Sequence, residues 1–292
     1  MPTCGIVLAG GNGTRLFPIT KSVNKHLIPI YDKPMIYYAI STLMMTGIRR
    51  IAIVTREIDS ELFKNLLGDG SRFGISITYL TQDYAKGVPD AFIVAEHFIG
   101  HDNIVLALGD NILVGQGLGK TLESALHHSG AHIFAFPVNN PEDYGIVTID
   151  SKTDKIIKIE EKPKLTKSKL AVPGLYFTDN NAVSYAKELK PSARGEIEIT
   201  QLLDLYLKDE KLSVSVFKRG IGWMDAGSVE SLYSAGELIG ILQKRQGMQF
   251  ANLEEIGWRN GWISDSDLVS AAGLYLNSPY GDYLRGLANN AK

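Results

Sequence analysis

Cysteine is almost absent from this chain of 292 residues, and hydrophobic runs long enough to span a membrane are absent altogether. The single cysteine, Cys4, excludes an intrachain disulfide and any zinc site built from several cysteines. Such sparse cysteine fits a reducing compartment. No stretch could cross a bilayer, and the first residues lack the basic region of a signal peptide. We therefore expect a cytoplasmic protein with no membrane partner.

An excess of charge of either sign is also missing. The 30 Lys and Arg residues nearly balance the 32 Asp and Glu residues, which gives a formal net charge of -2. Nucleic-acid-binding domains are usually basic, so this balance argues against a nucleic-acid partner. An anionic ligand would have to be held by a local site. The hydrophobic content of 45% is that of an ordinary globular protein.

Strand-like and helix-like patterns alternate through the first half of the chain. Short apolar runs typical of buried strands occupy residues 4–9, 51–55, 75–80 and 104–110, and helical patterns occupy 35–47, 59–67 and 90–99. This alternation predicts a parallel sheet with helices on both faces. From about residue 131, short β-type runs separated by turns predict mixed or antiparallel additions to the same sheet.

The last part of the chain is expected to be helical. Residues 229–246 read as one long helix, and weaker helical patterns follow at about 252–257 and 265–276. The fold class predicted is α/β: a single Rossmann-like sheet, mixed but mainly parallel, flanked by helices and followed by a C-terminal helical appendage. The α/β domain would span residues 1–240, and residues 241–292 would be a helical extension of the same body.

A glycine-rich loop, Gly10-Gly11-Asn12-Gly13-Thr14-Arg15, directly follows the first predicted strand. Glycines let backbone N–H groups approach an anion without interference from a Cβ atom. Arg15 adds a guanidinium group suited to phosphate oxygens. A strand, a glycine loop and a basic residue in this order predict a phosphate-binding site.

Two better-known phosphate loops do not fit. The dinucleotide fingerprint needs a third small residue where Leu16 stands, which argues against an NAD-dependent oxidoreductase. The segment Gly119-Lys120-Thr121 resembles the end of a Walker A loop, but Val114 occupies the place of the required first glycine.

Two aspartates lie at a strand end or in a turn of the predicted sheet, where ligands can bind. Asp110 ends the predicted strand 104–110, and ligands of open α/β sheets bind outside such strand ends. Asp225 lies in a turn bounded by Gly222 and Gly227. Mg²⁺ takes one or two carboxylates together with phosphate oxygens and water. From each residue alone, a helix cap or turn aspartate is an equal alternative.

The ordered set of motifs resembles the sugar-1-phosphate nucleotidylyltransferases, especially their thymidylyl-transferring branch. The motifs are LAGGNGTRLFPIT, KHLIPIYDKPMIYYAISTLM, LLGDGSRFG, GDNI, EEKP, GLYF, RGEIEIT and GWMDAGS, with EEIGWRNGWI and SPYGDYLRGL in the tail. The resemblance implies a Mg²⁺-dependent enzyme that joins dTTP to α-D-glucose 1-phosphate. The products would be dTDP-glucose and diphosphate, in the first step of a dTDP-deoxysugar pathway such as that of dTDP-rhamnose. It also implies a homotetramer.

The same resemblance assigns roles to individual positions. Residues of about 1–130 would form a nucleotide half and residues of about 131–228 a sugar-phosphate half. The nucleotide would be bound by Leu8, Gly10, Gly11, Gly13, Thr14, Arg15, Lys25, Gln82, Gly87 and Asp110. The sugar phosphate would be bound by Asn111, Gly145, Glu161, Lys162, Val172, Arg194 and Trp223. The catalytic set would be Arg15, Lys25, Asp110, Lys162 and Asp225, with Asp110 and Asp225 as the metal ligands. A remote regulatory site would involve Arg219, Glu255, Ile256 and Arg259.

Three departures from the motifs of that branch bear on substrate choice. His26 replaces a glutamine expected beside the ribose, Val88-Pro89-Asp90 replaces Leu-Ala-Gln, and Pro173 replaces a threonine. The alternatives are therefore a relative that uses UTP or another sugar, and a nucleotide-sensing protein that has lost turnover. The joint presence of the five catalytic residues argues against the sensor.

Overall fold

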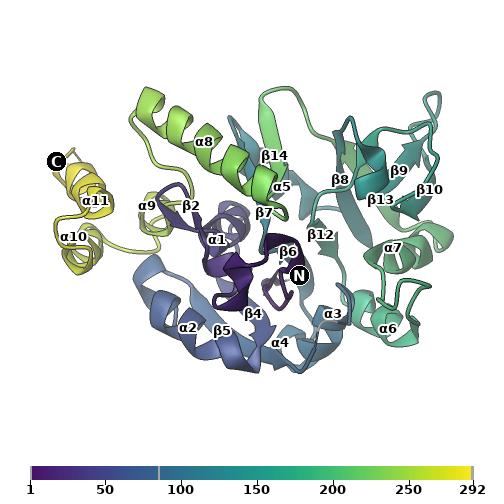
Figure 1. Ribbon diagram of the computed structural model, residues 1–292, viewed down its shortest axis with the longest axis horizontal. Coiled ribbons are helices and arrows are strands. Elements are labelled where there is room, and N and C mark those ends of the chain that lie inside the picture. Colours follow the sequence, from purple (N-terminus) through teal and green to yellow (C-terminus); the bar gives the residue numbers. More distant parts are fainter. Residues whose placement is uncertain (1, 85, 291–292) are drawn as a thin grey trace.

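A ten-stranded sheet runs through the protein, with helices packed against both of its faces (Figure 1). The computed structural model describes residues 2–84 and 86–290. The strands of this sheet are β1 (Thr3–Leu8), β4 (Arg50–Arg56), β5 (Ser76–Gln82), β6 (Asn103–Leu108), β8 (Ala131–Pro137), β9 (Gly145–Ile149), β10 (Ile156–Glu161), β11 (Leu170–Ala171), β12 (Leu175–Thr178) and β13 (Leu212–Val216). Along the sheet the order is β10-β9-β11-β8-β12-β6-β1-β4-β5, and β13 pairs with β8.

The sheet changes character at the pair of β6 and β12. Strands β5, β4, β1 and β6 are mutually parallel, whereas β12 runs antiparallel to both β6 and β8. Strands β9, β10 and β11 also pair antiparallel, whereas β13 runs parallel to β8. This mixed sheet, its flanking helices and the helices at the C-terminal end confirm the predicted α/β class.

Helices cover the two faces of the sheet and bury an apolar core under each. One face carries α1 (Ile36–Met45), α2 (Glu57–Leu67), α5 (Leu118–Ala125) and α9 (Leu253–Arg259). The other carries α3 (Asp90–Val94), α4 (Glu96–Ile99), α6 (Asn181–Glu188) and α7 (Ile199–Lys208). In β1 the buried Ile6 faces the second core and the buried Val7 the first. A strand covered on both sides needs apolar residues at every position, which is why it reads as a continuous apolar run.

Two small two-stranded sheets and the longest helix complete the body. Strand β7 (Asn111–Gly115) pairs antiparallel with β14 (Ile221–Asp225), and β2 (Pro29–Ile30) pairs with β3 (Lys33–Pro34). Helix α8 (Val229–Gln246) has the bounds expected from the sequence. The hydroxyl of Ser228 caps its first turn by accepting from the Ser231 N–H, and Gly247, at a φ of 66°, ends it.

The helical tail contains α9, α10 (Asp265–Leu274) and α11 (Pro279–Asn290). The sequence patterns led us to expect only the first two. The helix expected at 90–99 is divided into α3 and α4, because Ala95 has a φ of -90° and a ψ of 5°, outside α-helical geometry. Short 3₁₀ turns lie at Thr14–Leu16, Ile19–Lys21, Lys25–Leu27, Ser71–Phe73 and Pro141–Asp143. The boundary expected between residues 240 and 241 falls inside helix α8. The division of the chain into an α/β domain and a helical extension stays a prediction. No helix in the described part of the chain is long and apolar enough to span a bilayer.

A buried carboxylate fastens the tail to the body. Glu254, at the start of α9, is fully buried, and its two oxygens accept hydrogen bonds from the hydroxyls of Tyr275 and Tyr280, each at 2.5 Å. Lys33 of β3 is also buried and lies 5.7 Å from the ring centre of Tyr280. Polar groups of α9, α10, α11 and β3 therefore meet in one desolvated cluster.

We predict that Tyr280→Phe destabilises the protein. It removes the donor to one Glu254 oxygen and leaves a buried acceptor without a partner, which costs about 1–3 kcal/mol. Equilibrium urea unfolding measures this change. Tyr233→Phe serves as the matched control, because Tyr233 is 71% exposed on α8. Equal free energies of unfolding for the two variants would contradict the role given to Glu254.

Candidate active site

Two adjoining clefts open at the carboxyl ends of β1 and β6. The glycine-loop cleft is lined by Leu8, Gly11, Arg15, Lys25, His26, Gln82, Gly87, Val88, Leu108, Asp110 and Glu196. The Trp223 cleft is lined chiefly by Asn111, Tyr144, Gly145, Glu161, Lys162, Val172, Gly174, Arg194, Glu198, Thr200, Trp223 and Asp225. Arg15, Val88, Leu108, Asp110 and Glu196 line both clefts, so the two share a wall.

The residues expected to bind two different substrates separate into these two clefts. Seven of the expected nucleotide residues line the glycine-loop cleft; Gly10, Gly13 and Thr14 do not line it but shape its loop. All seven expected sugar-phosphate residues line the Trp223 cleft. Gly13 adopts a left-handed φ of 61° at the start of the first 3₁₀ turn, and its carbonyl accepts from Thr20 Oγ1 at 2.7 Å.

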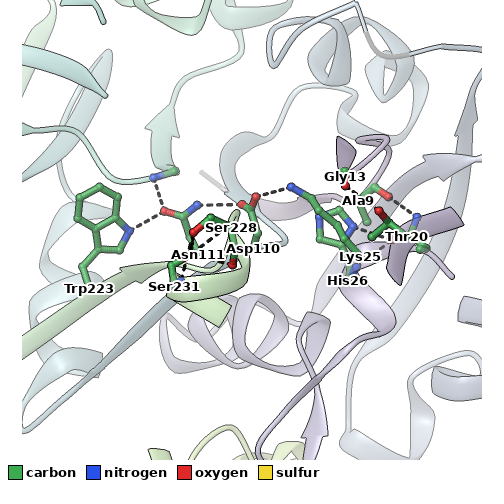
Figure 2. Close-up of polar contacts among 12 residues, drawn as sticks. Ala9, Gly13, Thr20, Lys25, His26, Asp110, Asn111, Trp223, Ser228 and Ser231 are labelled. Carbon is green, nitrogen blue, oxygen red and sulfur yellow. Dashed lines mark hydrogen bonds and ion pairs between the residues drawn. The ribbon is translucent and has the colours of Figure 1, made fainter. Parts of the chain in front are cut away.

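A chain of polar contacts connects the clefts through Asp110 (Figure 2). Lys25 Nζ forms an ion pair with Asp110 Oδ2. The other oxygen, Oδ1, accepts from Asn111 Nδ2 at 3.0 Å. Asn111 Oδ1 in turn accepts from Trp223 Nε1 at 2.7 Å and from the Gly174 N–H at 2.8 Å. The Asn111 amide therefore has only one orientation, because both of these partners are donors.

Electrostatics distinguishes the two aspartates. Burial alone would raise the pKa of Asp110, but the charge of Lys25 and the hydrogen bonds from Lys25 and Asn111 hold it well below its ordinary value. For Asp225, burial and then the charge of Asp110 raise the pKa to about 6. Repulsion between two buried carboxylates is relieved when a cation lies between them.

Asp225 ends β14 directly opposite Asn111 in the paired strands, and the Ala226 N–H donates to the Asp110 carbonyl at 3.0 Å. A Cβ atom on Gly227 would lie 2.6 Å from Arg15 Nη2 and 2.9 Å from Asp225 Oδ1, so both side chains lie beside this glycine. Arg15 and Asp110 line both clefts, and Asp225 lies next to them in the Trp223 cleft. Among the described residues, no cluster of three or more His, Cys, Asp or Glu side chains forms a complete metal site. A Mg²⁺ ion here would need phosphate oxygens or water to complete its shell.

His26 is buried beside the glycine loop, and Asn24 sets its tautomer. Asn24 Nδ2 donates to the Ala9 carbonyl and to Asp59, so its Oδ1 must accept from the His26 backbone N–H and from Nδ1, at 2.9 and 2.8 Å. Burial lowers the pKa of His26 to about 3. The ring is therefore neutral with its proton on Nδ1, which leaves Nε2 as a hydrogen-bond acceptor.

Gln82, the last residue of β5, reaches under the glycine loop. A Cβ atom on Gly10 would lie 2.0 Å from Gln82 Nε2, so Gly10 makes space for this amide. Gln82 is 5% exposed, and its Oε1 has no hydrogen-bond partner. A buried, unpartnered acceptor at a cleft wall fits a ligand that brings an N–H donor.

Lys162 has a backbone conformation that non-glycine residues rarely adopt. Its φ is 42°, and its N–H donates to the Tyr144 carbonyl at 3.0 Å. Such a conformation costs free energy and persists where the surrounding structure imposes it. Here it follows directly on β10, and Lys162 lines the Trp223 cleft together with Asp225. Tyr144 also packs against Trp223, with ring centres 5.0 Å apart.

Two carboxylates and an arginine form the far wall of the Trp223 cleft. Arg194 Nη1 lies 3.4 Å from Glu161 and 3.6 Å from Glu198, and Thr200 Oγ1 donates to Glu161 at 3.2 Å. Burial, and then the charge of Glu198, raise the pKa of Glu161. This wall therefore presents carboxylates that can accept hydrogen bonds from hydroxyl groups. It also presents the positive charge of Arg194, whose side chain is exposed enough to move.

A backbone bridge ties the walls of the two clefts together. Gly87 and Ile197 form an isolated parallel bridge, and the Ile197 N–H donates to the Lys86 carbonyl at 2.7 Å. A Cβ atom on Gly87 would lie 2.0 Å from the Ile197 carbonyl oxygen, and the φ of Gly87 is 123°. Only glycine fits there, which explains its presence in that stretch.

The expected regulatory residues lie elsewhere. Glu255 and Arg259 pair with each other on α9 at 2.7 Å, and Tyr283 donates to Glu255 at 2.8 Å. Ile256 packs against the core under α1, and Arg219 is exposed in the turn between β13 and β14.

Sequence reasoning did not single out the orienting role of Asn24, nor Tyr144, Glu198 and Thr200. Glu198 and Thr200 belong to a quoted motif and could have been found there. Asn24 and Tyr144 carried no signal in spacing or composition.

Comparisons with known proteins show which family the chain resembles. The nucleotidyl transferase family matches residues 4–240. A glucose-1-phosphate thymidylyltransferase of Neisseria meningitidis is 52% identical over 281 residues, which are 96% of this chain and 97% of that protein. One from Mycobacterium tuberculosis is 48% identical over 280 residues, again 96% of this chain and 97% of that protein.

Solved structures extend the comparison. A Bacillus anthracis protein assigned as a glucose-1-phosphate thymidylyltransferase, crystallised with sucrose, has a TM-score of 0.74 and 43% identity over 81% of this chain and 94% of its own. A UDP-glucose pyrophosphorylase complexed with UDP-glucose has a TM-score of 0.73 and 26% identity over 82% of this chain and 98% of its own. With a family match over most of its length and relatives this similar, the chain belongs to the nucleotidyl transferase family.

Proposed function

We propose that the protein transfers the thymidylyl group of dTTP to α-D-glucose 1-phosphate, giving dTDP-glucose and diphosphate. The observation that carries the proposal is the placement of Arg15, Lys25, Asp110, Lys162 and Asp225. All five line the two adjoining clefts, between which a nucleotide and a sugar phosphate can meet. The relatives of similar length and about 50% identity carry the name of this activity.

The reaction requires no nucleophile from the protein. An oxygen of the sugar phosphate attacks the α-phosphorus of dTTP in line, a new P–O bond forms, and the bond to the β-phosphate breaks as diphosphate leaves. Lys162 holds the attacking phosphate, while Arg15 and Lys25 hold the triphosphate. Positioning of two anions and neutralisation of developing charge supply the catalysis.

Asp110 and Asp225 are the residues that would hold Mg²⁺. Their fit rests on geometry, since Asp225 lies opposite Asn111 in the paired strands β14 and β7 and the Ala226 N–H donates to the Asp110 carbonyl. Burial, and then the charge of Asp110, raise the pKa of Asp225, as expected for carboxylates that suit a cation. When bound, the ion would offset phosphate charge. The two carboxylates would hold it beside the wall shared by the clefts, and Asn111 keeps Asp110 in place.

The remaining assignments follow from cleft chemistry. The unpartnered Oε1 of Gln82 fits the N3–H of thymine or uracil, whereas N3 of cytosine has no hydrogen to donate. Glu161 would accept hydrogen bonds from sugar hydroxyls.

A homotetramer in the cytoplasm is also part of the proposal. Exposed Tyr31, Tyr233 and Ile241 offer apolar surface for contacts between subunits. The regulatory role of Arg219, Glu255, Ile256 and Arg259 stays a proposal.

A diphosphate-release assay tests the proposal. dTTP, UTP, CTP, ATP and GTP are combined with several sugar 1-phosphates in the presence of Mg²⁺. We expect release with dTTP and glucose 1-phosphate, slower release with UTP and little with CTP. Asp110→Asn is the inactive control. Binding of dTTP without release from any pair would favour the nucleotide-sensing alternative.

We predict that Gly10→Ala and Gly11→Ala differ sharply. The new Cβ at position 10 would displace the Gln82 amide, whereas at position 11 the nearest atom is Lys25 Cε at 3.7 Å. Loss of base hydrogen bonds worth about 1–3 kcal/mol corresponds to a roughly 10–100-fold weaker binding of dTTP in the first variant only. Calorimetric titration measures it. Equal affinities would refute the role of Gly10.

We predict that Lys162→Ala lowers kcat/KM for glucose 1-phosphate by roughly 10²–10³ and leaves the affinity for dTTP nearly unchanged. The side chain is assigned to the attacking phosphate and not to the triphosphate. Lys158→Ala is the control, because Lys158 is exposed and pairs with Glu160 on the same strand. A matching loss of dTTP affinity would overturn the assignment.

We predict that dTTP is preferred to UTP and that His26→Gln widens the ratio of their kcat/KM values. His26 lies on the cleft wall where the ribose would lie, and its neutral ring presents only an acceptor there. Glutamine offers both a donor and an acceptor. Turnover of CTP should stay low in both proteins, because the discrimination against CTP is assigned to Gln82. An unchanged ratio would mean that His26 does not contact the ribose.

A further inference from the structure

The ion pair between Lys25 and Asp110 occupies the place where a metal ion is expected. Both side chains are nearly buried, with exposed fractions of 13% and 10%. Lys25 also contributes to the electrostatic surroundings of Asp225. The Lys25 ammonium is the cation that pairs with the Asp110 carboxylate on the wall between the clefts (Figure 2).

Of the two side chains that contact the Asp110 carboxylate, Lys25 is the one that can move away. Asn111 is held by Trp223 and by the Gly174 N–H, so its amide cannot turn away. Lys25 reaches Asp110 through a flexible four-carbon chain from the 3₁₀ turn Lys25–Leu27. A lysine side chain can move its charge over several ångströms without a change in the backbone.

The Lys25 side chain also lies within reach of the glycine loop, beside Gly11. A Cβ atom on Gly11 would lie 3.7 Å from Lys25 Cε and 3.8 Å from Nζ, so the ammonium lies directly beside the glycine loop. That loop is where the triphosphate is expected. The same ammonium can therefore pair with Asp110 or with a phosphate.

We propose that Lys25 substitutes for the metal cation in the free protein and is exchanged for it when nucleotide binds. Without nucleotide, the ammonium occupies Asp110 and opposes entry of a divalent ion. When the metal–triphosphate complex arrives, Lys25 moves to a phosphate and Asp110 receives the metal. The proposal rests on the assignment of Asp110 and Asp225 as metal ligands under the proposed function. It makes metal and nucleotide binding mutually dependent.

Metal binding without nucleotide tests this exchange directly. Mn²⁺ is titrated into the nucleotide-free protein and followed by electron paramagnetic resonance. Wild type should bind weakly at this site. Lys25→Met keeps the length of the side chain but removes its positive charge. This variant should bind one Mn²⁺ roughly 10–100-fold more tightly, because the ammonium group that repels the incoming cation is gone. Asp110→Asn in the same background should abolish the gain.

Lys187→Met is the matched control, because Lys187 also pairs with an acidic residue, Glu96, but on the exposed surface. Its affinity for Mn²⁺ should equal that of wild type. Tight binding by wild type, or an unchanged affinity in Lys25→Met, would overturn the exchange.

Thermal unfolding gives a second readout that holds even where Lys25→Met is poorly stable. With a chelator its Tm should fall below that of wild type, and millimolar Mg²⁺ should restore it, whereas wild type and Lys187→Met should respond little. No restoration by Mg²⁺ would contradict the proposal. Neither measurement uses turnover, so failure of the proposed reaction would appear separately in the diphosphate-release assay.

Discussion

The site depends on one buried carboxylate, Asp110, whose charge must be compensated. Lys25 contacts one of its oxygens and Asn111 the other. An uncompensated charge in this position would be strongly destabilising. Because Lys25 comes from the glycine-loop side and Asn111 leads to Trp223 on the opposite side, the compensation itself joins the two clefts.

The topology of the sheet explains why these groups meet. Parallel strands β1 and β6 place the glycine loop and Asp110 at the same edge. The change to antiparallel pairing at β12 brings Gly174 to that edge from the second half of the chain, and the pairing of β7 with β14 brings Asp225 opposite Asn111. The bridge between Gly87 and Ile197 then links the outer walls. Segments far apart in the sequence thus line two clefts that share a wall.

Much of this could be predicted from the sequence, and the limits have physical causes. The strand 4–9, the loop Gly10–Arg15 and the helix 229–246 follow from local periodicity and turn chemistry, which a single segment contains. The pairing of Asn24 with His26, the positive φ of Lys162 and the third tail helix do not, because each is imposed by contacts from elsewhere in the fold. The separation of the site residues into two clefts followed from the family resemblance and not from spacing.

The proposed function assigns base recognition and chemistry to different parts of the site, and this bears on the three departures from the family motifs. Gln82 at the end of β5 and Gly10 in the loop after β1 are the proposed base-binding residues, whereas the charged groups lie on the shared wall and beyond it. Val88 lines both clefts, and Pro173 precedes Gly174, whose N–H holds Asn111. Substitutions at such positions alter the shape that a base or sugar meets while the charges stay in place. A chain can therefore change its substrate preference and retain the same phosphoryl chemistry.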